Sequence, residues 1–167
     1  MHLSYKFLWY RVAPFLMCFA LILLNAVPFH WLPNYPYSFQ WILVPIFYYA
    51  VYYPQLLSSW AVFILAVIAD LLVARPFGVL PFSYILMFFI PNLLRKYLIE
   101  LTFWQLWGVF AGFLLVIELL SFGIVYILAT HPVAFYPIVI EFWGICLSYP
   151  FFIRFCAHLD RKVRETA

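Results

Sequence analysis

Residues 103–129 read FWQLWGVFAGFLLVIELLSFGIVYILA, the longest apolar stretch of the chain, in which Glu118 is the only charged residue. A transmembrane helix needs about 20 predominantly apolar residues, because the hydrocarbon core of a bilayer is about 30 Å thick. The stretch therefore predicts a helix that crosses a membrane.

The composition extends this interpretation to the whole sequence. Of its 167 residues, 69% are hydrophobic and 9% are charged, whereas a soluble domain carries about a quarter charged residues. So few charges cannot cover a globular surface. We expect residues 1–167 to form a single integral membrane domain with almost no soluble part. The net charge of +3 comes from scattered basic residues and indicates no nucleic-acid partner.

Five more apolar segments are separated by breaks that contain proline, glycine or charged residues. We predict an all-α bundle of six spans, in which Pro150 kinks the last one. Because the second to fourth spans are short, an arrangement of five spans, with one segment fused or re-entrant, stays open. The predicted spans are residues 12–29, 41–53, 60–73, 79–94, 103–129 and 138–155, and a basic cytoplasmic tail follows at residues 156–167.

The basic residues predict the orientation of these spans. Lys and Arg accumulate in cytoplasmic loops, and this bias orients membrane proteins. If the six-span chain starts inside, Arg75 is the only basic residue outside, and both termini are cytoplasmic. The eight basic residues on the inner side are then Lys6, Arg11, Arg95, Lys96, Arg154, Arg161, Lys162 and Arg164.

Three acidic residues within apolar segments are the candidate functional groups. An ionisable side chain at bilayer depth costs several kcal/mol and usually faces a partner inside the bundle. On the six-span topology Asp70, Arg75 and Glu141 lie near the same outer depth, and Glu118 lies near the middle of the fifth span. We favour a packing network of ion pairs and hydrogen bonds. A binding site for a partner's helix and a proton or substrate pathway remain the alternatives.

A glycine pair in the fifth span is a further candidate. Gly108 and Gly112 form a G-x-x-x-G step, which lets helix backbones approach closely in lipid. The step is interpreted either as a docking face for a partner's transmembrane helix or as internal packing of the bundle. Both interpretations stay open at this point.

Catalytic and metal-binding motifs are not found in the sequence. The three cysteines have no C-x-x-C spacing and lie in apolar runs, where they act as small hydrophobes. His30 and His131 have no second ligand at metal spacing. No nucleophile elbow, phosphate loop or zinc helix is present. We therefore predict no enzymatic activity, no cofactor and no metal site.

One local pattern resembles a known family. Residues 60–79 read WAVFILAVIADLLVARPFGV, an apolar helix that ends in Asp-Leu, with a glycine eight residues after the aspartate. This pattern resembles the signature of the bacterial rod shape-determining MreD family, and Asp70 and Gly78 occupy the matching positions. The resemblance implies that the aspartate caps or ties down the turn and that the glycine permits a positive φ before the next helix.

The similarity extends over the chain. Length, six spans, a proline-rich first outer loop, Glu118 in the fifth span, Pro150 in the last span and a basic tail all agree with the family. Val62 and Ala66 differ, because the family often has glycines at these two places.

The resemblance implies a multi-pass protein of the bacterial inner membrane. Its bundle would be similar to the substrate-binding membrane subunits of energy-coupling-factor transporters. As a non-enzymatic scaffold of the cell-wall elongation machinery, it would maintain rod shape by binding the bitopic protein MreC. It would thereby link the MreB filaments to the RodA glycosyltransferase and its transpeptidase partner.

A small-molecule-binding membrane subunit of a transporter is the alternative function. Such a site needs several converging polar groups in a cavity. The set of polar residues in the apolar segments is thin, which favours the scaffold.

Overall fold

The computed structural model describes residues 2–26, 40–72, 78–128 and 135–166. Within these ranges the chain forms seven α-helices and no strand, so the all-α class is confirmed. The helices are α1 (His2–Ala26), α2 (Leu43–Tyr52), α3 (Ser59–Leu72), α4 (Val79–Leu93), α5 (Arg95–Leu98), α6 (Phe103–Leu128) and α7 (Tyr136–Thr166).

Two helices are long and apolar enough to cross a membrane. They are the whole of α6, with 26 residues, and the 24-residue part of α7 at Tyr136–Leu159. In the 18-residue apolar stretch considered in each helix, only 22% is buried, whereas the core helix of a soluble protein is mostly buried. The other apolar helical segments are shorter: they are the part of α1 at Val12–Asn25 and the helices α2, α3 and α4, of which α2 has only 10 residues.

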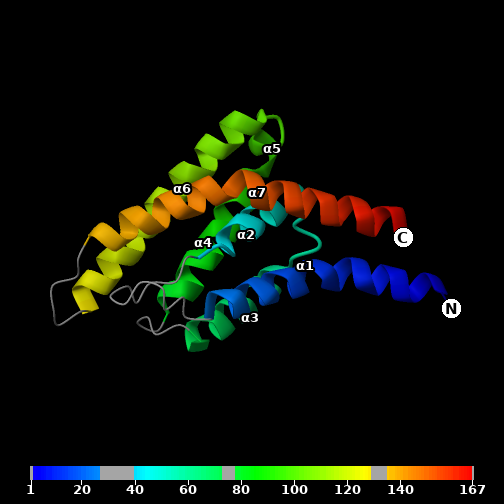
Figure 1. Ribbon diagram of the computed structural model, residues 1–167, viewed down its shortest axis with the longest axis horizontal. Helices are drawn as coiled ribbons and strands as arrows, with labels where there is room; N and C mark the ends of the chain where they lie inside the picture. Colours follow the sequence, from blue (N-terminus) through cyan, green and yellow to red (C-terminus); the bar gives the residue numbers. More distant parts are fainter. Residues whose placement is uncertain (1, 27–39, 73–77, 129–134, 167) are drawn as a thin grey trace.

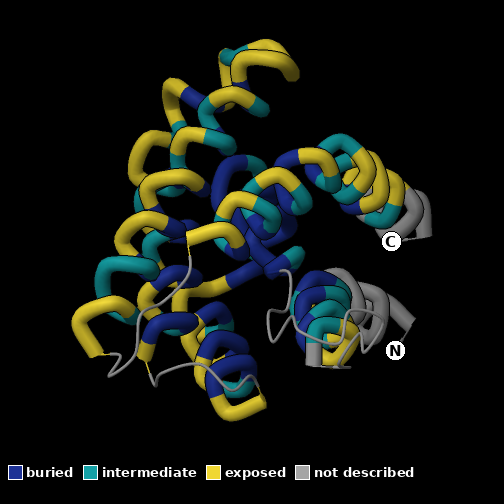
Figure 2. The backbone as a smooth tube through the Cα atoms, turned by 60° about the vertical axis from the view of Figure 1, so that its left-hand side comes forward, coloured by how far each residue is buried: buried dark blue, intermediate teal, exposed yellow. Residues whose placement is uncertain are grey.

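The short helix α2 is the centre of the bundle. Every residue from Ile42 to Val51 is buried, and α2 contacts both α4 and α7. α4 also packs on α3 and α6, and α1 packs on α3. Figure 2 shows α2 as a buried element enclosed by helices whose outer faces are exposed.

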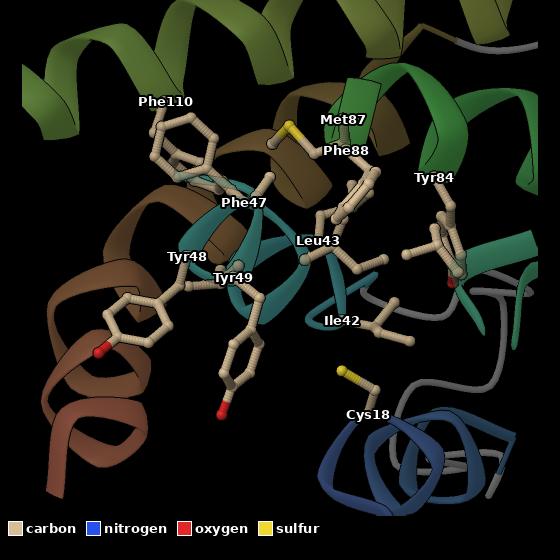
Figure 3. Packing of buried hydrophobic residues seen from close by; sticks show 14 of the residues in the cluster. Cys18, Ile42, Leu43, Phe47, Tyr48, Tyr49, Tyr84, Met87, Phe88 and Phe110 are labelled. Carbon is tan, nitrogen blue, oxygen red and sulfur yellow. The ribbon is translucent and has the colours of Figure 1, made fainter. Parts of the chain in front are cut away.

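Aromatic rings fill much of the core around α2 (Figure 3). The ring of Phe47 on α2 meets Phe110 of α6 edge-on, with centroids 5.2 Å apart, and Phe110 stacks on Tyr149 of α7 at 4.5 Å. Aromatic pairs in these geometries are favourable beyond the area they bury. They hold α2, α6 and α7 against one another.

Apart from the four-residue helix α5, successive helices run in opposite directions. The chain runs away from its N-terminus in α1 and back in α2, and the same alternation continues through α3, α4, α6 and α7 (Figure 1). Both termini consequently lie at the same end of the bundle (Figure 1).

The observed helices differ from the predicted spans mainly at their ends. α1 already begins at His2, and α7 continues through Pro150 to Thr166, so most of the basic tail is helical. Neither extension contains glycine or proline. Because α1 begins at His2, Pro14 lies inside the helix, and the prediction from the sequence that Pro14 lies in the first turn of this span is wrong. The break predicted between the spans at residues 79–94 and 103–129 contains the short helix α5, which was not predicted from the sequence.

Candidate functional site

The turn between α3 and α4 is held by a contact between Asp70 and Gly78. Asp70 is buried near the end of α3, and its Oδ2 accepts a hydrogen bond of 2.8 Å from the backbone N–H of Gly78. Gly78 is the N-cap of α4 with a φ of 93°. A carboxylate at a helix N-terminus is stabilised by the helix dipole and by the charge-assisted bond.

The aspartate contact and the positive φ expected at Gly78 are thus confirmed. A φ of 93° is readily adopted only by glycine, because a Cβ clashes with the backbone in the left-handed region. Oδ1 of Asp70 is buried and has no hydrogen-bond partner among the described residues. Arg75 lies outside those residues, so its place in the expected network stays a prediction.

Glu141 has a partner that the sequence analysis did not identify. Gln40 Nε2, just before α2, donates a hydrogen bond of 3.2 Å to Glu141 Oε1 on α7. Both residues are buried, so the bond ties the start of the central helix to α7 in an apolar environment. A glutamine at the edge of an apolar segment looks like a loop residue in the sequence, and no signal pairs it with a residue 101 positions away.

Glu118 lies beside a polar seam between α4 and α6. The hydroxyls of Ser83 and Ser121 are 2.9 Å apart. Because Ser83 Oγ donates to the carbonyl of Val79 at 2.8 Å, its one proton is used, and Ser121 is the donor between the two serines. Glu118 is buried one turn before Ser121. Such buried contacts are typical of helices held together in lipid.

Gly108 and Gly112 lie on the exposed side of α6. A Cβ built on either glycine meets no heavy atom within 4 Å, so the step is not internal packing among the described helices. Trp104 and Val116, one turn to either side, are 72% and 51% exposed. The glycine step is therefore a shallow gap in an open apolar helix face.

Two contacts compensate for backbone carbonyls that have lost their usual donors. Pro150 has no N–H and leaves the carbonyl of Cys146 without its helical partner. Trp107 Nε1 on α6 donates to that carbonyl at 3.1 Å. At the end of α2, Arg95 donates from Nε to the carbonyl of Val51 at 2.9 Å and from Nη2 to that of Tyr52 at 3.3 Å. Neither contact was predicted from the sequence, because each joins segments that are distant in the chain.

These contacts join helices and satisfy polar groups, and none of them brings a nucleophile next to a general base. In the described part of the chain, no three His, Cys, Asp or Glu residues gather as they would around a metal ion. Comparisons with protein-family models, curated proteins and solved structures find no match to this chain.

Proposed function

We propose that this chain is a non-enzymatic, multi-pass scaffold of the bacterial inner membrane that belongs to the MreD family. In this role it binds an MreC-like bitopic protein and links MreB filaments to peptidoglycan synthesis. The Asp70–Gly78 turn carries the proposal, because the resemblance rests on these two positions. The turn has the aspartate contact and the positive φ that the family pattern implies.

The topology that we propose has six crossings with both termini in the cytoplasm. Alternating helix directions and the shared end of the two termini (Figure 1) support it. With 31 residues, α7 is about 46 Å long at 1.5 Å per residue. It can cross a core of about 30 Å and still carry its basic end into water. Reporter fusions at both termini should therefore read cytoplasmic, and a periplasmic signal at the C-terminus contradicts six crossings.

The open face of α6 supports the partner-binding part of the proposal. Lipid chains and apolar side chains are equally hydrophobic, so helices associate in a bilayer through close packing and a few polar contacts. Gly108 and Gly112 have no Cβ and face open space, which allows a second helix to approach the backbone of α6. We place the MreC-like helix at this step.

The test is recovery of partners with the tagged full chain in mild detergent, identified by mass spectrometry. Gly112→Leu should reduce recovery of the MreC-like protein, because its side chain fills the gap. The fold should be preserved, since no neighbour lies within 4 Å of the new Cβ. Ala20→Leu is the matched control, because Ala20 is also an exposed small residue but lies on α1.

The outcomes separate the two classes of function. If elongation proteins are recovered with Ala20→Leu but not with Gly112→Leu, the result supports the scaffold function and the docking face on α6. Equal recovery with both variants places the partner elsewhere. Recovery of an ATPase pair with a coupling subunit, together with tight vitamin binding, contradicts the scaffold and identifies a transporter subunit.

A further inference from the structure

The junction of α4 and α5 carries two adjacent basic residues at the end of the central helix. Arg95 is half-buried, and its Nε and Nη2 bind the carbonyls of Val51 and Tyr52. The C-terminus of a helix carries only about half a negative charge, so these contacts leave part of the guanidinium charge uncompensated. Lys96, the next residue, is exposed.

Large exposed rings flank this basic pair. Tyr97 follows directly and is 73% exposed, and Trp104 at the start of α6 is 72% exposed. Tyr and Trp favour the headgroup level of a membrane, because part of each ring is apolar and another part forms hydrogen bonds with water or lipid. The rings indicate that the α4–α5–α6 bend lies at the surface of the bilayer.

The charge of the bend favours an anionic ligand. Between residues 79 and 117 the only acidic residue is Glu100, which is exposed and therefore solvated. Arg95 and Lys96 thus leave this segment with a net positive charge. Guanidinium and ammonium groups are the side chains that best bind phosphate oxygens.

We propose that Arg95 and Lys96 bind the phosphate headgroup of an anionic phospholipid, with Tyr97 and Trp104 inserted among its neighbours. Arg95 is held in place by the two carbonyls of α2, so its remaining N–H groups approach the phosphate in a fixed geometry. Lys96 contributes a mobile charge from the exposed side. This inference rests on the membrane location in the proposed function and does not depend on the identity of the protein partner.

The test uses the full chain reconstituted in bilayers of mixed phosphatidylcholine and phosphatidylglycerol. Spin-labelled versions of both lipids measure the preference of the protein for the anionic one. Lys96→Gln should lower this preference about fivefold, the effect of one basic residue near an anionic surface. Arg161→Gln is the control, because it removes an equal exposed charge from α7, whose C-terminal end lies apart from α5 in Figure 1.

Three results overturn the inference: no lipid preference in the unmodified protein, an equal loss with Lys96→Gln and Arg161→Gln, or displacement of the lipid by inorganic phosphate. An equal loss of lipid preference in the two variants indicates a diffuse electrostatic attraction between the protein and the anionic bilayer. Displacement of the lipid by inorganic phosphate indicates a site for free phosphate. Partner recovery is measured with the same variants. Lys96→Gln should leave it unchanged, so a failure of lipid binding is distinguishable from a failure of the scaffold proposal.

Discussion

Trp107→Phe should destabilise the bundle because it removes the donor that compensates for Pro150. The indole Nε1 lies 3.1 Å from the carbonyl of Cys146, which is the acceptor that the N–H of residue 150 would serve in an uninterrupted helix. In a membrane, freed carbonyls near a proline are tolerated when neighbouring helices supply a donor.

The expected cost of this change is on the order of 1 kcal/mol. Leaving a buried acceptor unsatisfied costs about 1–3 kcal/mol, and interhelical hydrogen bonds in membrane proteins average about 0.6 kcal/mol with a maximum of about 1.7 kcal/mol. The phenyl ring retains most of the apolar contact. Trp104→Phe is the matched control and should cost less, because that ring is 72% exposed.

A double-mutant cycle with Pro150→Ala isolates the hydrogen bond. Alanine restores a backbone N–H for the carbonyl of Cys146, so Trp107→Phe should cost less in the alanine background than in the parent. The free energy of unfolding of the purified protein is measured by denaturant titration in mixed micelles. If Trp107→Phe costs the same in both backgrounds, the indole does not replace the missing bond, and the reasoning is refuted.

Two further predictions concern the turn between α3 and α4. Gly78→Ala should lower the free energy of unfolding by about 1–2 kcal/mol because of its φ of 93°. Gly123→Ala, in helix α6 and facing open space, should raise the free energy of unfolding by about 0.5–1 kcal/mol. The same denaturant titration measures both variants, and changes of equal sign contradict the prediction. Asp70→Ala should lower the free energy of unfolding by about 1.5–3 kcal/mol, because it removes the charge-assisted hydrogen bond. Glu100 is exposed, so Glu100→Ala should lower the free energy of unfolding much less. Equal yields of folded protein from the two variants would show that the Asp70 contact contributes little.

Local patterns were sufficient to predict the helical class and most of the helix positions. The apolar segments and their proline and glycine breaks predicted α2, α3, α4 and α6 to within two residues at each end, because helix limits depend on nearby residues. The contact of Asp70 with Gly78 and the positive φ of Gly78 were expected from the resemblance to a family signature, in which the two positions are eight residues apart.

Contacts between distant helices could not be derived in this way. The bond between Gln40 and Glu141 and the one from Trp107 to Cys146 depend on how the helices pack. In a soluble helix the polar face marks the outside, but α6 is apolar over most of its surface, and only Glu118 and Ser121 distinguish the core face. The apolar periodicity alone does not separate the core face from the exposed face. Packing of α6 against α4 and α7 places Phe110 inside and leaves Gly108 and Gly112 open, because in lipid the two faces differ in their neighbours and not in their hydrophobicity.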